Sequence, residues 1–362
     1  MKRLYVIAWC AAMLAVASFR QARPTTTFRA ADRAPVPREW LLKPASDLTP
    51  EEHRRTPDQT FLTYPEWFLV FGPAEYAESL RLRTATSFPL VTHIQQAWES
   101  DAAVSDQIGG IYPPNEEYNT MIKVINISST LEFGIKAAYE ETVGRITDVN
   151  GGVVATDEDR FAADFAGEYV KVIEHVPWYD FDFISQTKRL WSEVPWLGEH
   201  PLRKLERRYF LTSELLVKAA YGWVIKQAAA STYAKPLMVT CVILERPLTG
   251  AHEDATVIQT FADGSVLAEW PRYAAFTPLA IEAARQGIAF RAIAGNRTAV
   301  LVSAVGPSDS ISPGQAKILF SQSIPTKPGL RRWAVATQVS ELHNTLRQME
   351  SDGLNVEHVF DF

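Results

Sequence analysis

The sequence has little cysteine and no excess of positive charge. Only two of its 362 residues are cysteines, Cys10 and Cys241. This excludes a disulfide scaffold and a thiolate-rich zinc or iron–sulfur site. The net charge of −6 excludes a generally basic nucleic-acid-binding protein. Seven histidines permit a metal site without indicating one, so the sequence predicts no metal, no cofactor and no nucleic-acid partner.

Familiar catalytic motifs are also absent from the sequence. The chain contains no G-x-S-x-G elbow, no Walker loop, no G-x-G-x-x-G after a predicted strand and no H-E-x-x-H pair. An enzyme is therefore the less favoured interpretation. The composition is globular, with 47% hydrophobic and 22% charged residues, and the length allows two domains.

The N-terminus carries a hydrophobic segment. Two cations precede an uncharged run from Leu4 to Phe19. Its 16 residues are many for a signal-peptide core and few for a membrane span, which needs about 20. We predict that residues 1–23 attach the protein to a membrane. They do so either as a retained anchor or as a signal peptide cleaved after Ala17.

The residues after this segment predict an exported body on a tether. A lone Cys241 has no second cysteine in the body to mispair with, which favours a periplasmic over a cytoplasmic location. Residues 24–57 combine several prolines with a basic charge balance, a pattern typical of an extended tether. Such a tether is attracted to anionic headgroups, and a merely solvated linker is the alternative.

Residues 58–232 have the pattern of a helical domain, which contains a repeat. The segment that begins at Glu132, EFGIKAAY, matches ELLVKAAY at Glu214, 82 positions later. We therefore predict two similar units, 60–148 and 155–232, related by duplication, with chance similarity as the alternative. Further matches, 93 positions apart, are Glu75-Tyr76 with Glu168-Tyr169, Phe88 with Phe181, and Trp98 with Trp191.

Local signals divide this domain into helices. Thr63-Tyr64-Pro65-Glu66 has the spacing of a capping box, and Gly72-Pro73 predicts the end of one helix and the start of another. Asn115 is placed to cap a longer helix. Apolar residues recur along that helix and predict a single apolar stripe, formed by Met121, Val124, Leu131, Ile135 and Ala138.

Each repeat places a carboxylate, a lysine and a tyrosine on one face of its last helix. If the two helices meet, paired carboxylates become candidates for acid–base chemistry or for holding a hard metal. We favour the simpler interpretation, an i,i+4 salt bridge copied with the helix. The weak catalytic candidates are Glu132, Glu214, Tyr139 and Tyr221.

Aromatic and basic side chains supply the candidate interaction residues. Most rings are expected in a helical core, and a minority are left for a membrane interface or a protein partner. Cations at residues 202–208 open the last helix and oppose its dipole. An acidic partner, lipid headgroups or nearby carboxylates would compensate them, or they would be solvated. The candidates are Trp67, Trp178, Tyr179, Trp196, Arg203, Lys204, Arg207 and Arg208.

From residue 233 the pattern changes to strands and helices in the order β-β-β-α-β-β-β-β-α-β. Two helix–glycine–strand segments favour two β-α-β halves on a mostly antiparallel sheet, a ferredoxin-like domain over 233–362. Cys241 lies in an apolar strand pattern and is expected to be buried and inert. The predicted fold class is α+β multidomain, with an N-terminal membrane-targeting helix, a duplicated all-helical domain and a ferredoxin-like domain.

These features together favour a membrane-anchored, non-catalytic interaction or scaffold protein that contacts a membrane complex. One alternative is an enzyme with a carboxylate and tyrosine site between the two helical units. Another is a protein that binds a lipid or a small amphiphile.

Overall fold

The computed structural model describes residues 36–361 apart from short gaps at 43–44, 110, 113–115, 233–236, 251–253 and 308–313. The chain divides into two compact units. The helical unit contains the described residues of 67–95 and 125–236, and the α+β unit contains those of 25–66, 96–124 and 237–362. The predicted membrane segment and the predicted cap Asn115 lie outside the described residues.

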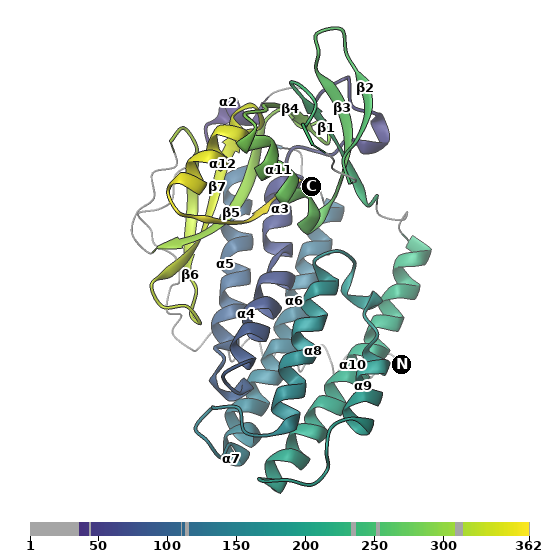
Figure 1. The fold of residues 1–362 in the computed structure, drawn as a ribbon, viewed down its shortest axis with the longest axis vertical. Helices are drawn as coiled ribbons and strands as arrows, with labels where there is room; N and C mark the ends of the chain where they lie inside the picture. The colour runs from purple at the N-terminus through teal and green to yellow at the C-terminus, as the bar shows by residue number, and fades with distance from the viewer. Residues whose placement is uncertain are drawn as a thin grey trace. The chain divides into compact units, whose positions relative to one another are not determined.

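Long α-helices make up the helical unit (Figure 1). Helices α4 and α8 pack against each other through small and aliphatic side chains such as Ala77, Leu80 and Val170. A capping box of Thr156 and Asp159 begins α8. In chain order the helical elements are α4 (Phe68–Leu80), η3 (Ala85–Ser87), α5 (Leu90–Ile108), α6 (Glu116–Tyr139), η4 (Glu140–Gly144), α7 (Arg145–Thr147), α8 (Asp157–Ile173), η5 (Trp178–Asp180), α9 (Phe183–Ser192) and α10 (Pro201–Thr232).

Two of the predicted helix boundaries are wrong. Thr63 lies inside α3 (Gln59–Glu66) and its hydroxyl donates back to the Gln59 carbonyl, so it caps nothing. Gly72-Pro73 lies inside α4 rather than between two helices. A Cβ at Gly72 would touch the Phe133 and His93 rings at 3.6–3.7 Å. Tertiary packing here outweighs the local preference of the glycine–proline pair.

The strands of the α+β unit lie close to their predicted positions. They form two four-stranded antiparallel sheets with the strand orders β2-β3-β1-β4 and β6-β7-β5-β8. The strands and their helices are β1 (Val239–Leu244), β2 (Thr256–Thr260), β3 (Val266–Pro271), η6 (Tyr273–Ala275), α11 (Phe276–Arg285), β4 (Phe290–Ile293), β5 (Ala299–Pro307), β6 (Lys317–Ser323), β7 (Leu330–Gln338), η7 (Val339–Glu341), α12 (Leu342–Ser351) and β8 (Asn355–Val359).

The two sheets and their helices share one apolar core. Trp270 and Phe276 from the first half and Trp333 and Leu346 from the second belong to the same buried cluster. Helices α11 and α12 contact each other within the unit (Figure 1). The mixture of helices with antiparallel strands confirms the predicted α+β class. The expected single sheet is instead divided in two, because β4 and β8 each close their own half.

Part of the predicted tether is folded. Within residues 36–57, α2 (Arg38–Leu41) and η2 (Glu51–His53) are short helical turns, and Leu41 is buried. Backbone amides of Ser46 and Arg55 donate to the carbonyls of Gly295 and Ala294. The prolines limit these helices to single turns, as expected. The segment is not extended, because it packs against the rest of the α+β unit.

Among the described residues, none of the helices combines the length and the hydropathy that a membrane crossing requires.

Candidate functional site

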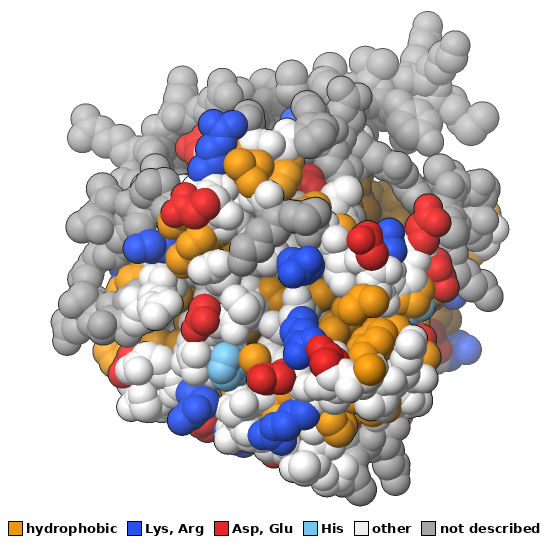
Figure 2. All heavy atoms as spheres, turned by 90° about the horizontal axis from the view of Figure 1, so that it is seen from above, with side chains coloured by type: hydrophobic (Ala, Val, Ile, Leu, Met, Phe, Trp, Pro, Cys, Tyr) orange, Lys and Arg blue, Asp and Glu red, His pale blue; other side chains and the backbone are white. Residues whose placement is uncertain are grey.

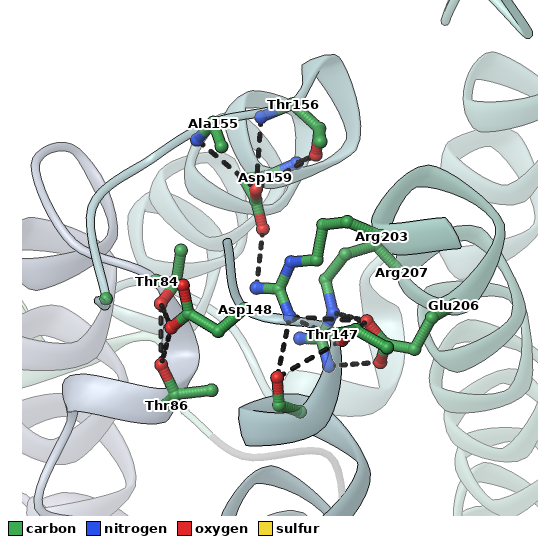
Figure 3. Close-up of polar contacts among 12 residues, drawn as sticks. Thr84, Thr86, Thr147, Asp148, Ala155, Thr156, Asp159, Arg203, Glu206 and Arg207 are labelled. Atoms are coloured by element: carbon green, nitrogen blue, oxygen red, sulfur yellow. Dashed lines mark hydrogen bonds and ion pairs between the residues drawn. The ribbon is translucent and has the colours of Figure 1, made fainter. Parts of the chain in front are cut away.

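The interior of the helical unit is charged. The four cations that open α10 are all at least 97% buried, and each is paired with carboxylates of the same unit. Figure 3 shows part of this cluster, in which Arg203 points toward Asp159 of α8 and both Arg203 and Arg207 lie beside Glu206 of their own helix. We call it the arginine–acid cluster, formed by Arg203, Lys204, Arg207, Arg208, Glu140, Asp157, Glu158, Asp159 and Glu206.

Arg203 is the most heavily bonded member of this cluster. Its Nη2 lies 2.9 Å from the Asp159 carboxylate, and its Nη1 lies 3.3 Å from Glu206 and 3.2 Å from the Thr147 hydroxyl (Figure 3). Asp159 also accepts from the Thr156 amide and so completes the cap of α8. One carboxylate therefore ties the start of α8 to the start of α10, which explains why four cations are tolerated at a positive helix end.

The remaining cations have similar partners. Arg207 lies 2.8 Å from Glu140 and also contacts Glu206, while Arg208 lies 2.7 Å from Glu158. Burial raises the pKa of Glu140, and the guanidinium of Arg207 opposes that shift. Since each of these guanidinium groups is paired with a carboxylate of the same unit, the cluster is a structural ion-pair network.

This placement changes the interpretation of the basic candidates. Arg203, Lys204, Arg207 and Arg208 were expected to need compensation, and nearby carboxylates provide it. Buried side chains cannot form an interaction surface, so these four residues do not serve as one in this structure. The sequence could not locate their partners, because Glu140 and Asp157–Asp159 lie on segments far away along the chain.

The carboxylates of the two predicted repeats are held by lysines. Lys136 Nζ lies 2.7 Å from Glu214, and Lys218 Nζ lies 2.8 Å from Glu132. Both pairs join α6 to α10, and Lys218 reaches its own-helix neighbour Glu214 only at 3.9 Å. Burial opposes ionisation of Glu214, but the two lysines hold its pKa below the usual value. We expected salt bridges between residues four apart on one helix. The carboxylates do form salt bridges, but the closer lysine lies on the other helix in both cases.

The two candidate tyrosines are not part of a common site with these carboxylates. Tyr139 stacks on Phe210 at a ring separation of 4.4 Å. Tyr221 stacks on Trp178 at 5.4 Å, and its hydroxyl lies 3.2 Å from that of Ser128. Burial raises the pKa of Tyr139, and hydrogen bonding to Glu206 raises it further.

The aromatic candidates differ in exposure. Trp67 is buried in the helical unit, and Trp178 and Tyr179 are half-buried. Trp196 is 55% exposed, packs edge-on against Trp191 and lies over the Arg208 guanidinium at 4.2 Å. Trp196 is therefore the one of the four that is placed to meet a partner directly.

A cluster of metal-ligating side chains in the α+β unit was not predicted. His53, Cys241 and Glu269 each offer a donor atom, and the three atoms lie within 4.8 Å of one another. Burial raises the pKa of the Cys241 thiol to about 11, with added repulsion from Glu269 and Glu52. Cys241 is buried, as expected. Its neighbours were not recognised because His53 lies in the supposed tether, 188 positions away.

The face of the molecule in Figure 2 shows acidic, basic and hydrophobic side chains intermixed among the described residues. Comparison with protein-family models, with curated proteins and with solved structures finds no match to this chain.

Proposed function

We propose that this protein is a non-catalytic interaction protein, held at a membrane by its N-terminal segment, that contacts a membrane protein complex through its helical unit. In this proposal the body of the protein lies in the periplasm. The observation that supports it best is that α10 has buried cations on one side and a row of exposed apolar residues on the other.

Helix α10 has an apolar outer stripe at a spacing of seven residues. Leu202, Tyr209, Leu216 and Trp223 are all about half or more exposed, with Trp223 at 66%. Residues seven apart lie on nearly the same side of an α-helix. The opposite side carries the arginine–acid cluster and Lys218. A soluble helix normally has the reverse arrangement, and contiguous exposed apolar surface is characteristic of interaction sites.

Helix α6 shares part of this arrangement, although Glu132 is exposed and Phe133 is buried. Ile127 and Ile135, the latter 61% exposed, face outward, while Lys136 and Asn126 are buried. Exposed apolar residues thus occur on both long helices, whereas isolated surface hydrophobics occur singly. A protein partner that covers these stripes would bury the apolar side chains.

We also propose that the helical unit arose by duplication. The elements follow the same order, with η3 and η5, and the starts of α5 and α9, each 93 positions apart. Equivalent contacts recur as well. Lys136 lies over the Tyr76 ring at 4.5 Å, and Lys218 lies over Tyr169 at 4.6 Å.

The exchanged ion pairs give further support to the duplication. Each lysine contacts the carboxylate of the other repeat, Lys136 with Glu214 and Lys218 with Glu132. Reciprocal exchange of this kind is the contact pattern of a two-fold axis, in which residue i meets j and j meets i. The rings paired with those lysines also recur, since Tyr76 packs edge-on against Phe88 at 5.0 Å and Tyr169 against Phe181 at 5.3 Å.

A ferredoxin-like relationship for the α+β unit is proposed in a restricted sense. In each half a helix connects two strands that flank a third, β3-α11-β4 around β1 and β7-α12-β8 around β5. That is the split β-α-β connection of ferredoxin-like folds, used here once in each sheet.

The alternatives find less support. In an enzyme, Glu132 and Glu214 would need an available carboxylate, whereas lysines neutralise both. For an amphiphile carrier, the apolar cavity beside Trp270 and Leu244 has a volume of about 40 Å³. Small-molecule sites are typically several hundred Å³, so this cavity is too small for a lipid chain.

The proposal is tested by photo-crosslinking in intact membranes. A crosslinkable amino acid replaces Tyr209, Leu216 or Trp223, one at a time, in the full chain. The matched control replaces Arg347, an exposed residue of α12 in the other unit. We expect a discrete protein adduct from the α10 positions and none from position 347.

Two results would contradict this function. Adducts to lipid alone would favour direct membrane contact, and equal protein adducts from α10 and the control would remove the specificity. As a second readout, Leu216→Ser and Trp223→Ser should abolish the adduct while leaving the thermal unfolding temperature unchanged, because exposed side chains contribute little to folding. Deleting residues 2–19 should release the body from the membrane fraction.

A further inference from the structure

The cluster of His53, Cys241 and Glu269 has the features of a metal centre. Cys241 and Glu269 are directly opposite each other on the antiparallel strands β1 and β3. Opposite residues in such a pair project to the same face of the sheet, with Cβ atoms about 4.5–5.5 Å apart. The thiol and the carboxylate are therefore set side by side by strand register rather than by a flexible loop.

His53 lies at this face of the sheet because hydrogen bonds hold the turn that contains it. Its neighbour Arg55 donates its backbone amide to the Ala294 carbonyl at 2.9 Å, and Arg54 donates from Nε to the Thr49 carbonyl at 2.7 Å. Gly295 has a positive φ of 80°, and a Cβ there would lie 3.2 Å from Arg54 Cγ. A side chain at position 295 would be strained at this positive φ and would press against Arg54, the residue that follows His53.

The spacing of the donor atoms fits a shared ion better than a hydrogen bond. His53 Nε2 lies 3.7 Å from Glu269 Oε1, beyond the usual 2.7–3.2 Å range of a hydrogen bond. Two ligands of one tetrahedral zinc ion are separated by about 3.3–3.8 Å, given metal–ligand bonds of about 2.0–2.3 Å. The widest separation in the cluster, within 4.8 Å, requires a side-chain adjustment of only about 1 Å.

The surroundings also suit a cation. His53 Nδ1 is buried and has no hydrogen-bond partner among the described residues. Two carboxylates, Glu269 and Glu52, act electrostatically on Cys241. The side of the sheet that carries Cys241 is otherwise apolar, with Ile243 and Leu267 as neighbours. Glu269 is 37% exposed and His53 only 11%, so the cluster opens to solvent on the carboxylate side.

We propose that His53, Cys241 and Glu269 bind a divalent transition-metal ion of the zinc class. A nitrogen, a thiolate sulfur and a carboxylate oxygen are the donors that Zn²⁺ accepts together, whereas Mg²⁺ and Ca²⁺ prefer oxygen alone. Three protein ligands leave a fourth position for water or for a group from a partner. On binding, the thiol loses its proton to solvent as the sulfur–zinc bond forms.

The proposal is tested on the full chain in detergent, with Zn²⁺ and Co²⁺ as the probes. After metal removal and reloading, we expect one zinc ion per chain by elemental analysis. The Co²⁺ form should show a thiolate-to-metal charge-transfer band, which requires the cysteine as a ligand. His53→Ala, Cys241→Ser and Glu269→Gln should each weaken Zn²⁺ binding by about 10- to 100-fold or more.

Matched controls separate this site from adventitious binding. Cys10→Ser removes the only other cysteine, and His175→Ala removes an exposed histidine of the helical unit. Both should retain full binding and the Co²⁺ band. Gly295→Ala should weaken binding without altering a ligand. Thermal unfolding without metal shows that each variant is folded, and Zn²⁺ should then raise the unfolding temperature of the parent but not of Cys241→Ser.

Three outcomes would overturn the proposal. These are a parent without stoichiometric zinc, a Co²⁺ complex that lacks the thiolate band, and unchanged zinc affinity in a folded Cys241→Ser variant. The zinc content and the Co²⁺ spectrum are measured on the parent protein. The proposal can therefore be rejected even if a variant fails to fold.

Discussion

The two units bury different kinds of side chain. The interior of the helical unit holds the Lys136–Glu214 pair and the arginine–acid cluster, whose side chains are at or below 10% exposure apart from Asp157 at 40%. The shared core of the α+β unit is instead a continuous set of apolar residues from both sheets and both helices. The stability of the α+β unit therefore comes chiefly from apolar burial, whereas the helical unit also depends on the pairing of desolvated charges.

This difference has a consequence for the outer surfaces. In α10 many of the apolar residues are exposed on the outer side of the helix, so they do not contribute to the core. Buried ion pairs add little net stability compared with apolar packing, but they are strongly directional. The ion pairs therefore fix a defined arrangement of α6, α8 and α10, while several apolar residues of α10 stay exposed.

The largest expected effect comes from breaking the arginine–acid cluster. Arg203→Met keeps an apolar stem but leaves Asp159 buried without its cation and Glu206 with Arg207 alone. Removal of one partner of a buried pair typically costs about 3–5 kcal/mol. Because the chain has two units, hydrogen exchange of the amides in α8 and α10 is a better measure than a single unfolding curve.

A matched substitution in the other unit sharpens this test. Leu346→Ala in the apolar core of the α+β unit should cost about 2–5 kcal/mol through the cavity it leaves, and it should accelerate exchange in α11 and α12. If Arg203→Met left the exchange of α8 and α10 unchanged, the helical unit would not depend on its buried charges, and the contrast between the units would fail.

A smaller effect is expected from the buried carboxylate of Asp361 in the α+β unit. Burial raises its pKa to about 7, although Arg272 lies 3.7 Å away and opposes this shift. Because the folded pKa exceeds the unfolded value, the native state holds the proton more tightly. Stability is therefore fully present below about pH 4 and is lost as the pH rises through 7, by a few kcal/mol in all.

Asp361→Asn should remove that loss. Urea unfolding of the parent and the variant at several pH values between 5 and 8 gives the difference in unfolding free energy. That difference should grow in favour of the variant as the pH rises. Burial lowers the pKa of His358 and gives the opposite trend below about pH 6.5, but it does so in both proteins and cancels in the comparison. A constant difference across this range would show that Asp361 does not titrate there.

The sequence predicted the elements of the α+β unit far better than its sheets. The apolar strand pattern around Cys241 and the glycines after α11 and α12 are local signals, and the elements follow the predicted order. Whether eight strands form one sheet or two depends on pairings such as β5 with β8, which join residues at least fifty positions apart. Local patterns carry no information about those pairings.

In the helical unit, the sequence identified a helix face but not whether that face is buried. The apolar stripe of α6 was recognised correctly, yet Ile135 faces solvent while Lys136 is buried. Periodicity identifies a face but does not say which face is covered, and the usual assumption fails where buried cations have carboxylate partners. His53 was missed for a related reason, since proximity to Cys241 and Glu269 arises only when the segment before α3 packs on the sheet.

The smallest expected effect concerns an exposed ion pair that lies next to a buried ion pair in the chain. Glu140 and Glu141 are adjacent, but Glu140 is buried against Arg207, whereas Glu141 is 56% exposed and lies 2.9 Å from Arg145. An exposed pair contributes about 0–1 kcal/mol, because water screens it and two long side chains lose freedom. A double-mutant cycle of Glu141→Gln and Arg145→Gln should therefore give a coupling free energy below about 1 kcal/mol that decreases with added salt. A larger, salt-independent coupling would place this pair with the buried cluster, and exposure would then be a poor guide to which charges hold the helical unit together.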